Sequence, residues 1–134
     1  MVEGSGAPER MTSVDASWRM RVCASTELVD QGLGVRFQVS DRLPAFAIRS
    51  GGVVHAYLNR CAHVPVELDW LPGQFLDERG VYLVCATHGA NYEPASGACV
   101  DGPCRNRNLR KIPVIEQEGS VWVDLSQSLL TSLE

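Results

Sequence analysis

The sequence predicts an all-β domain, built as an antiparallel sandwich or barrel. Its apolar residues fall into short runs of three to seven residues that are rich in Val, Ile, Tyr, Phe and Trp, the residue types that favour strands. Turn-forming Gly, Pro, Asp and Ser residues separate these runs. Only two short segments have a helical pattern, and many short strands joined by turns are typical of sandwiches and barrels.

The N-terminal half supplies four of the expected strands. WRMRVCA predicts the first strand, and the Ser-Thr-Glu-Leu that follows it can form one turn of helix. GVRFQV and AFAIR predict the next two strands, and a Leu-Pro step precedes the second of them. A Ser-Gly-Gly hairpin turn then leads into VVHAYL, because glycine adopts the positive φ angles that such turns need. These strands span residues 18–24, 34–39, 45–49 and 53–58.

The C-terminal half supplies four more strands, each introduced by turn residues. VYLV follows an Arg-Gly pair, and ACV follows a Ser-Gly pair. RKIPVI predicts a single strand, and a Glu-Gly-Ser hairpin turn joins it to SVWVDL. The final segment, residues 126–133, has a short helical pattern. These four strands span residues 81–84, 98–100, 110–115 and 120–125.

Length and composition indicate one ordinary globular domain. The chain has 134 residues, of which 45% are apolar and 21% charged, so it can bury one sizeable core. Its formal net charge of −4 and its pI near 5.3 argue against a nucleic acid or an anionic membrane surface as partner. We expect a flexible arm over residues 1–16, the domain over residues 17–126 and a tail over residues 127–134.

The sequence predicts neither a membrane span nor a secretory signal. It has no run of about 18 apolar residues, the minimum for a transmembrane helix. Its first residues lack the charged region and apolar stretch of a signal peptide. A cytoplasmic location is therefore expected, where thiols stay reduced and clusters of Cys and His favour a metal site over a disulfide.

Two Cys/His pairs are the candidate metal ligands. Cys61 and His63 are separated by one residue, Cys85 and His88 by two, and each pair follows an expected strand. Structural thiols, a zinc site and a [2Fe–2S] cluster are three interpretations. Zinc fingers place two cysteines on one loop and two histidines on a helix. A cluster with two cysteines on one iron and two histidines on the other fits one Cys and one His per loop, the pattern found here.

These motifs resemble the signature of the Rieske [2Fe–2S] family. CAH at 61–63 and CATHG at 85–89 are similar to its two cluster loops. NYEPASGACVDGP at 91–103 is similar to the segment that leads to a Gly-Pro loop beside the cluster. The resemblance covers residues 18–125, and it implies a Rieske-like fold with a cluster-binding subdomain over about residues 59–105.

The resemblance implies one [2Fe–2S] cluster per chain and names its four ligands. Cys61 and Cys85 would bind the inner iron, and His63 and His88 would bind the outer iron at the tip of the protein. Charged thiolates are stabilised by surrounding N–H donors, whereas neutral imidazoles can lie toward solvent, where a partner can approach. Two neutral ligands make the cluster less negative, so that it accepts an electron more readily than an all-cysteine cluster does.

The resemblance also assigns residues around the cluster. Tyr92 is at the position of a tyrosine that donates a hydrogen bond to a cysteine sulfur, and Gly102 and Pro103 match the Gly-Pro loop. Cys99 and Cys104 flank this loop. They are either two reduced thiols or a disulfide that stiffens the loop, and their spacing permits a bridge without requiring one.

Three positions differ from the respiratory members of the family. Those subunits form a disulfide between their cluster loops, and the matching positions here are Val66 and Thr87. They also have a serine that donates a hydrogen bond near the cluster, where this chain has Ala90. Because hydrogen bonds to the sulfurs favour the reduced cluster, the resemblance implies a potential in the lower part of the family's range. A soluble Rieske-type ferredoxin of an oxygenase system fits best.

The implied function is single-electron transfer, without catalysis in this chain. A flavin NAD(P)H reductase would be the donor and an oxygenase or a related terminal enzyme the acceptor, each docking transiently. The residues that follow His88 leave no room for a mononuclear-iron domain of the kind found in large Rieske oxygenases. Three alternatives stay open: a small Rieske subunit of a nitrite-reductase-like complex, an iron–sulfur redox sensor and a zinc-stabilised binding module.

The spacer between the two Cys/His pairs carries large apolar residues with two possible roles. Trp70, Leu71 and Phe75 lie near a Pro-Gly turn. They either pack against the cluster-binding subdomain or form an exposed ridge that docks a partner. Cys23, on the first expected strand, is most simply a small core residue.

Overall fold

The computed structural model describes residues 19–41, 43–62, 66–69, 71–85, 89–103 and 107–125, and in these residues the chain is almost entirely β-structure. The predicted all-β class is confirmed, whereas the expected arm, tail and C-terminal helical segment fall outside the described residues. One turn of 3-10 helix, η2 (Ser25–Glu27), lies where a helical turn was predicted. The strands are β2 (Arg19–Ala24), β3 (Val35–Ser40), β4 (Leu43–Ser50), β5 (Val53–Leu58), β6 (Leu83–Cys85), β7 (Ala90–Tyr92), β8 (Cys99–Asp101), β9 (Lys111–Ile112), β10 (Val114–Gln117) and β11 (Ser120–Asp124).

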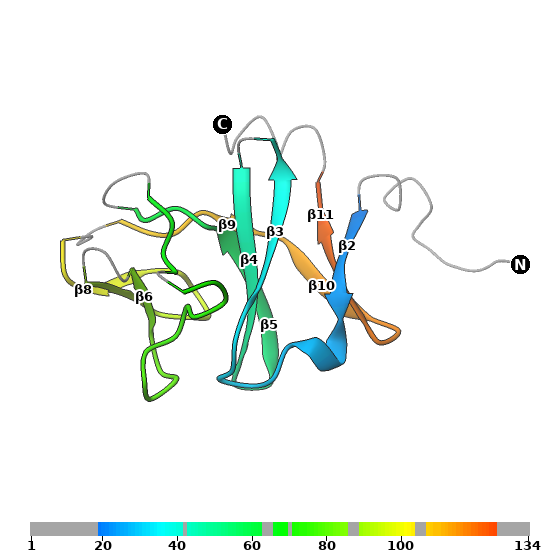
Figure 1. Cartoon of the computed structure of the whole chain (residues 1–134), viewed down its shortest axis with the longest axis horizontal. Helices are drawn as coiled ribbons and strands as arrows, with labels where there is room; N and C mark the ends of the chain where they lie inside the picture. Colours follow the sequence, from blue (N-terminus) through cyan, green and yellow to red (C-terminus); the bar gives the residue numbers. More distant parts are fainter. Residues whose placement is uncertain are drawn as a thin grey trace, which may run out of the picture.

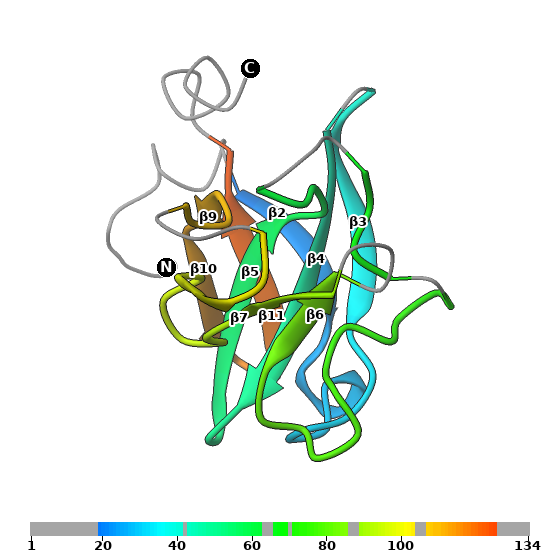
Figure 2. The same cartoon turned by 90° about the vertical axis from the view of Figure 1, so that its left-hand side faces the viewer.

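The described strands form three antiparallel sheets, side by side along the molecule. Their strand orders are β10-β11-β2, β3-β4-β5-β9 and β6-β7-β8. Figure 1 shows the four-stranded sheet in the middle, with β2, β10 and β11 on one side and β6 and β8 on the other. Figure 2 views the molecule from the side of the small sheet, so that β6 and β7 lie in front of β4 and β5. The small sheet lies within the range of about residues 59–105 that was expected for a cluster-binding subdomain.

Strand β4 contributes to two hydrophobic cores because its two faces are both covered. Ala45 and Ala47 pack in the core shared with β2 and β11. Phe46 and Ile48, which point to the opposite face, pack in the core shared with the small sheet. The continuous apolar run of AFAI reflects this two-sided burial, since a strand with one wet face would alternate with polar residues.

Two tight turns confirm the hairpins predicted from the sequence. Gly51 and Gly52 have φ values of 63° and 80° between β4 and β5, and Glu118 and Gly119 have φ values of 53° and 79° between β10 and β11. Two successive positive φ angles match the twist of the strands they join.

The predicted single strand over residues 110–115 is wrong, because Pro113 divides it. Lys111 and Ile112 form β9, which pairs with β5 in the central sheet. After Pro113 the chain continues as β10, which pairs with β11 in a different sheet. Proline has no N–H to donate to a ladder, so it marks the point where the chain leaves one sheet for the other.

Strand β7 was not predicted from the sequence. It is only three residues long, and two of them, Ala90 and Asn91, have low strand propensity. Pairing with β6 and β8 on its two sides makes it the middle strand of the small sheet. Strand β6 was predicted to begin too early: the expected strand spans residues 81–84, whereas β6 begins at Leu83.

The spacer between the Cys/His pairs is anchored by an aromatic stack. The ring of Phe75, which is 1% exposed, stacks on that of Phe46 with centroids 3.9 Å apart and planes inclined by 11°. Leu71 is 54% exposed, and Trp70 lies outside the described residues. Packing is therefore the role of Phe75, and the docking-ridge interpretation is wrong for this residue.

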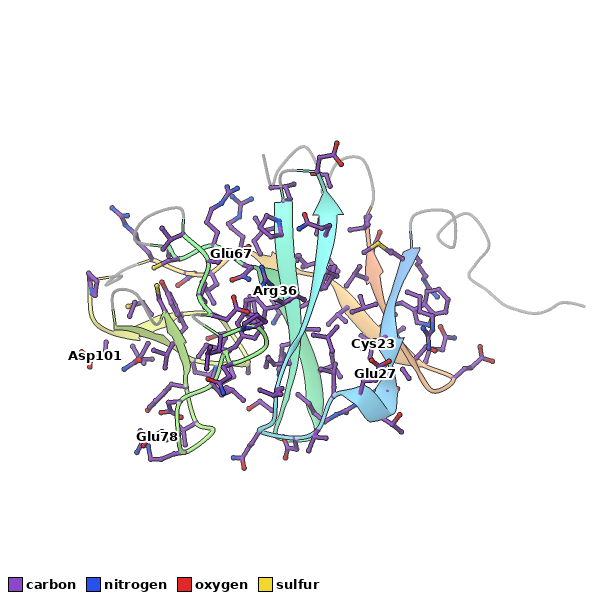
Figure 3. The ribbon with its side chains drawn as sticks, viewed as in Figure 1. Cys23, Glu27, Arg36, Glu67, Glu78 and Asp101 are labelled. Atoms are coloured by element: carbon purple, nitrogen blue, oxygen red, sulfur yellow. The ribbon has the colours of Figure 1, made fainter. Side chains whose placement is uncertain are left out.

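The interior position of Cys23 was predicted correctly, and it is remote from the small sheet. Cys23 is 3% exposed in the core beside β11. Figure 3 places it at the β2 side of the molecule, opposite Asp101. In the part of the chain that the structure describes, no helix is long and apolar enough to cross a membrane.

Replacing Phe75 by alanine is expected to lower the free energy of unfolding by about 3–5 kcal/mol, because it leaves a cavity under the stacked ring of Phe46. Leu71→Ala, in the same spacer, should change it by no more than about 0.5 kcal/mol, because its side chain is mostly in water. Chemical denaturation followed by circular dichroism measures both. Equal effects of the two substitutions would contradict the anchoring role of Phe75.

Candidate metal centre

The two motif cysteines belong to the same hydrophobic core, which the small sheet shares with the central sheet. Cys61 follows β5 and is 3% exposed, and Cys85 ends β6 and is fully buried. Neither forms a disulfide, and both belong to the core that also contains Phe46 and Tyr92. The other two predicted ligands, His63 and His88, lie outside the described residues.

The first Cys/His loop is closed by backbone hydrogen bonds. The Cys61 N–H donates to the Val66 carbonyl at 2.7 Å, which ties the two described ends of the loop together. The next amide, that of Ala62, donates to the hydroxyl of Tyr92 at 3.0 Å. Both N–H groups are thus paired with protein acceptors, and these two bonds fix the backbone on either side of the Cys61 side chain.

The second Cys/His loop is the hairpin loop between β6 and β7. Cys85 and Ala90 are paired residues of these strands, and the Gly89 N–H donates to the Cys85 carbonyl at 2.8 Å. Gly89 has a φ of 71°, a left-handed conformation that glycine adopts without strain. The glycine of the motif therefore closes the loop immediately after its predicted histidine ligand.

Tyr92 connects β7 to the first loop. Its hydroxyl lies 3.3 Å from the Cys61 Sγ and also accepts the Ala62 N–H, so its own proton is directed to the sulfur when Cys61 is a thiolate. Burial, followed by the interaction with Cys61, raises the pKa of Tyr92 above its usual value. The phenol therefore keeps its proton throughout the neutral range and remains a donor.

A third loop, after β8, touches both Cys/His loops. Gly102 has a φ of 97°, and a Cβ at this position would lie 2.9 Å from the Ala90 Cα and 3.0 Å from the Gly89 carbonyl oxygen. Only glycine fits so close to the second loop. The Arg107 guanidinium donates to the Ala62 carbonyl of the first loop at 3.2 Å. The neighbouring Pro103 is exposed.

Cys99, at the start of β8, is a disulfide-bonded cysteine. Its Sγ lies 3.6 Å from the Asp101 carbonyl, a contact and not a hydrogen bond, because a disulfide sulfur has no proton to donate. The predicted partner, Cys104, lies outside the described residues. The pairing of Cys99 with Cys104 therefore stays a prediction.

The described residues fit an iron–sulfur group. Two buried cysteines that form no disulfide supply soft sulfur ligands in one core, and the Tyr92 phenol beside Cys61 stabilises thiolate charge. Within the described ranges, no group of three or more His, Cys, Asp or Glu side chains is placed to hold a metal ion. Any further ligands would lie outside these ranges, where the predicted ligands His63 and His88 are found.

Three polar residues near the first loop were not assigned any role from the sequence. The contact of Arg107 with the Ala62 carbonyl has no sequence signature. Asn59 and Asp69 are the buried polar residues of the described chain, with exposures of 1% and 8%. The one available signal was the position of Asn59, a polar residue directly after a buried strand and two residues before a candidate ligand.

The sequence of the chain matches a known domain family. The Rieske [2Fe–2S] domain matches over residues 18–122, which is most of the chain. No curated protein sequence matches it.

Solved structures with the same fold include ferredoxins of oxygenase systems. The ferredoxin of carbazole 1,9a-dioxygenase from Nocardioides aromaticivorans IC177 is 22% identical, with a TM-score of 0.66 over 81% of this chain and 98% of that chain. The ferredoxin of Sphingomonas yanoikuyae B1 is 24% identical, with a TM-score of 0.64 over 79% of this chain and 97% of that one. A chain from a complex of reduced oxygenase and oxidized ferredoxin in carbazole 1,9a-dioxygenase is 23% identical, with a TM-score of 0.67 over 81% and 94%.

The Tyr92→Phe substitution is expected to lower the reduction potential of the cluster by about 60 mV. A hydrogen bond to sulfur that stabilises the reduced state by about 1.4 kcal/mol more than the oxidised state shifts a one-electron potential by about 59 mV. Tyr57→Phe is a matched control, since the equally buried Tyr57 donates to the Pro94 carbonyl at 2.6 Å and not to a cysteine. Redox titration of both variants checks this, and equal potentials would contradict the donor role of Tyr92.

Proposed function

Because the chain belongs to the Rieske [2Fe–2S] family, we propose that it is a one-electron carrier of the ferredoxin type, with one cluster per chain. The observation that carries the proposal is the pair of motif cysteines, which form no disulfide and are buried in the same core. When bound, a Rieske cluster accepts and releases a single electron. Catalysis would belong to a partner.

The proposed ligands divide between two loops and two irons. Cys61 and Cys85 hold the inner iron from the buried side, and His63 and His88 hold the outer iron. The Tyr92 hydroxyl supports this arrangement, because it orients the Cys61 sulfur and donates a hydrogen bond to it. The contacts of Gly102 and Arg107 with the other loops supply further rigidity.

The surroundings of the cysteines favour a potential in the lower part of the Rieske range, which extends from about −150 to about +300 mV. The described first loop has Val66 where respiratory members have a bridging cysteine, and the position of their donating serine is the fully buried Ala90. Fewer hydrogen bonds to the sulfurs leave the reduced cluster less stabilised.

We infer that the acceptor is an oxygenase or a related terminal enzyme and the donor a flavin NAD(P)H reductase. Support for the acceptor comes from two of the solved structures. One is the ferredoxin of carbazole 1,9a-dioxygenase, and the other is a complex of the oxygenase and the ferredoxin of such a system. The reductase follows from the family resemblance alone. Docking has to be brief, since a carrier must release one partner before it meets the other. The cytoplasmic location stays a prediction.

The first test is anaerobic purification followed by visible absorption and low-temperature EPR after reduction with dithionite. A red-brown protein with the EPR signal of a reduced mixed-ligand cluster supports the proposal. A colourless protein without an EPR signal that carries stoichiometric zinc would replace it with a zinc-stabilised binding module. Stopped-flow mixing of the reduced protein with a candidate oxygenase then tests the acceptor.

Simultaneous replacement of His63 and His88 by cysteine is expected to retain a [2Fe–2S] cluster and to move its potential toward the plant-type value of about −400 mV. Two additional anionic ligands raise the negative charge of the cluster and make its reduction harder. His55→Cys, which changes the one histidine outside the motifs, should leave the potential as it is. An unchanged potential in the double variant would show that these histidines are not ligands.

A further inference from the structure

Asn59, just before the first Cys/His loop, holds the two ends of this loop together through its side chain. Its side-chain oxygen accepts the Leu68 N–H at 2.8 Å, and its own N–H donates to the Pro44 carbonyl of β4 at 2.8 Å. Asn59 lies two residues before Cys61, and Leu68 lies two residues after Val66, which accepts the Cys61 N–H. Two nested hydrogen bonds therefore connect the ends of this loop and fix it to the central sheet.

A buried carboxylate holds Asn59 in this orientation. The Asn59 Nδ2 donates to the Asp69 Oδ1 at 3.0 Å, and the other oxygen of Asp69 accepts the Gly73 N–H at 2.9 Å. The Asp69 side chain has no solvent exposure. Gly73 in turn accepts the Gly34 N–H at 2.8 Å. One carboxylate thus connects the first Cys/His loop, the spacer and the segment that leads into β3.

A guanidinium compensates the buried charge. The Arg36 Nε lies 3.7 Å from the Asp69 Oδ2, and the Arg36 Nη2 lies 2.9 Å from both oxygens of Glu67. Figure 3 shows Arg36 and Glu67 close together, where the first loop meets the sheet of β3. The side chains of Arg36 and Glu67 are 38% and 43% exposed, so water stabilises their charges. The Asp69 side chain has no contact with water, so its negative charge is compensated by Arg36.

We propose that Asp69 is a positioning residue for electron transfer: through Asn59 it holds the first Cys/His loop, and hence Cys61, in place, and Arg36 balances its charge. The expected effect on the reduction potential rests on the proposed function, because it requires a bound cluster. The positioning of the loop does not, because it depends only on hydrogen bonds within this chain.

The chemistry of the network requires a carboxylate at position 69. Both of its oxygens accept hydrogen bonds, one from the Asn59 amide and one from the Gly73 backbone. An asparagine has a single acceptor oxygen, so its NH2 group would face one of these two donors. The Asp69→Asn variant therefore keeps the shape of the side chain and loses one hydrogen bond together with the charge.

The experiment compares Asp69→Asn with Asp77→Asn, and Arg36→Gln with Arg79→Gln. Asp77 and Arg79 form a more exposed pair in the same spacer, with 3.5 Å between their charged groups. Amide hydrogen exchange at Leu68 and Gly73 measures how firmly the loop is held. We expect exchange at least tenfold faster in Asp69→Asn, the factor that corresponds to about 1.4 kcal/mol, and wild-type exchange in Asp77→Asn.

The reduction potential is a readout that simple loosening of the fold would not produce. Loss of the negative Asp69 favours the reduced cluster and should shift the potential upward, whereas loss of the positive Arg36 should shift it downward. Shifts of opposite sign support the proposal. Shifts of the same sign, or exchange rates in Asp69→Asn equal to those in Asp77→Asn, would overturn it.

Two further samples keep the test decisive. Arg36→Lys retains the positive charge and should therefore retain the wild-type potential. This variant tests the charge role even if Asp69→Asn does not fold. A potential equal to that of Arg36→Gln would refute the charge role. Absence of an iron–sulfur EPR signal in the wild type would reject the proposed function. Exchange at Leu68 and Gly73 would still decide the positioning role in that same protein.

Discussion

Strand β4 has to satisfy two hydrophobic cores at once, because sheets cover both of its faces. Its alanines pack against the sheet of β2, β10 and β11, and Phe46 and Ile48 pack against the small sheet. The small sheet has three strands of three residues each, too little structure to be stable alone. It is ordered because β4 and β5 give it a surface to pack on. The position of both cysteines therefore depends on the central sheet.

Hydrogen bonds close both cysteine-bearing loops, and strands β6 and β7 also flank the second loop. Each loop is closed by a backbone bond, Cys61 to Val66 in the first and Gly89 to Cys85 in the second. Tyr92 ties the first loop to the strand that follows the second. Such a site needs little rearrangement when an electron arrives, because the Tyr92 hydroxyl is already positioned beside the Cys61 sulfur.

Much of the fold could be predicted from local sequence, and so could four candidate ligands, whose assignment stays a prediction. Turn residues and β-branched runs located the strands that bound the loops, and the spacing of the Cys/His pairs indicated the chemistry. What escaped prediction depends on long-range contacts. Pro113 was hidden in an apolar run, and β7 is a strand only because β6 and β8 pair with it. Asn59 and Asp69 are ten residues apart, and no local pattern shows that they meet in the interior.

The three loops at the small sheet stabilise one another, so metal binding and loop order are linked. Gly102 packs on the second loop, Arg107 donates to the first, and Tyr92 joins the first loop to β7. A ligand that binds both Cys61 and Cys85 adds its binding free energy to these contacts only in the folded arrangement. The buried polar network at Asn59 and Asp69 acts before that ligand arrives. It keeps the first loop near its bound position, so that less of the binding free energy is consumed in ordering the chain.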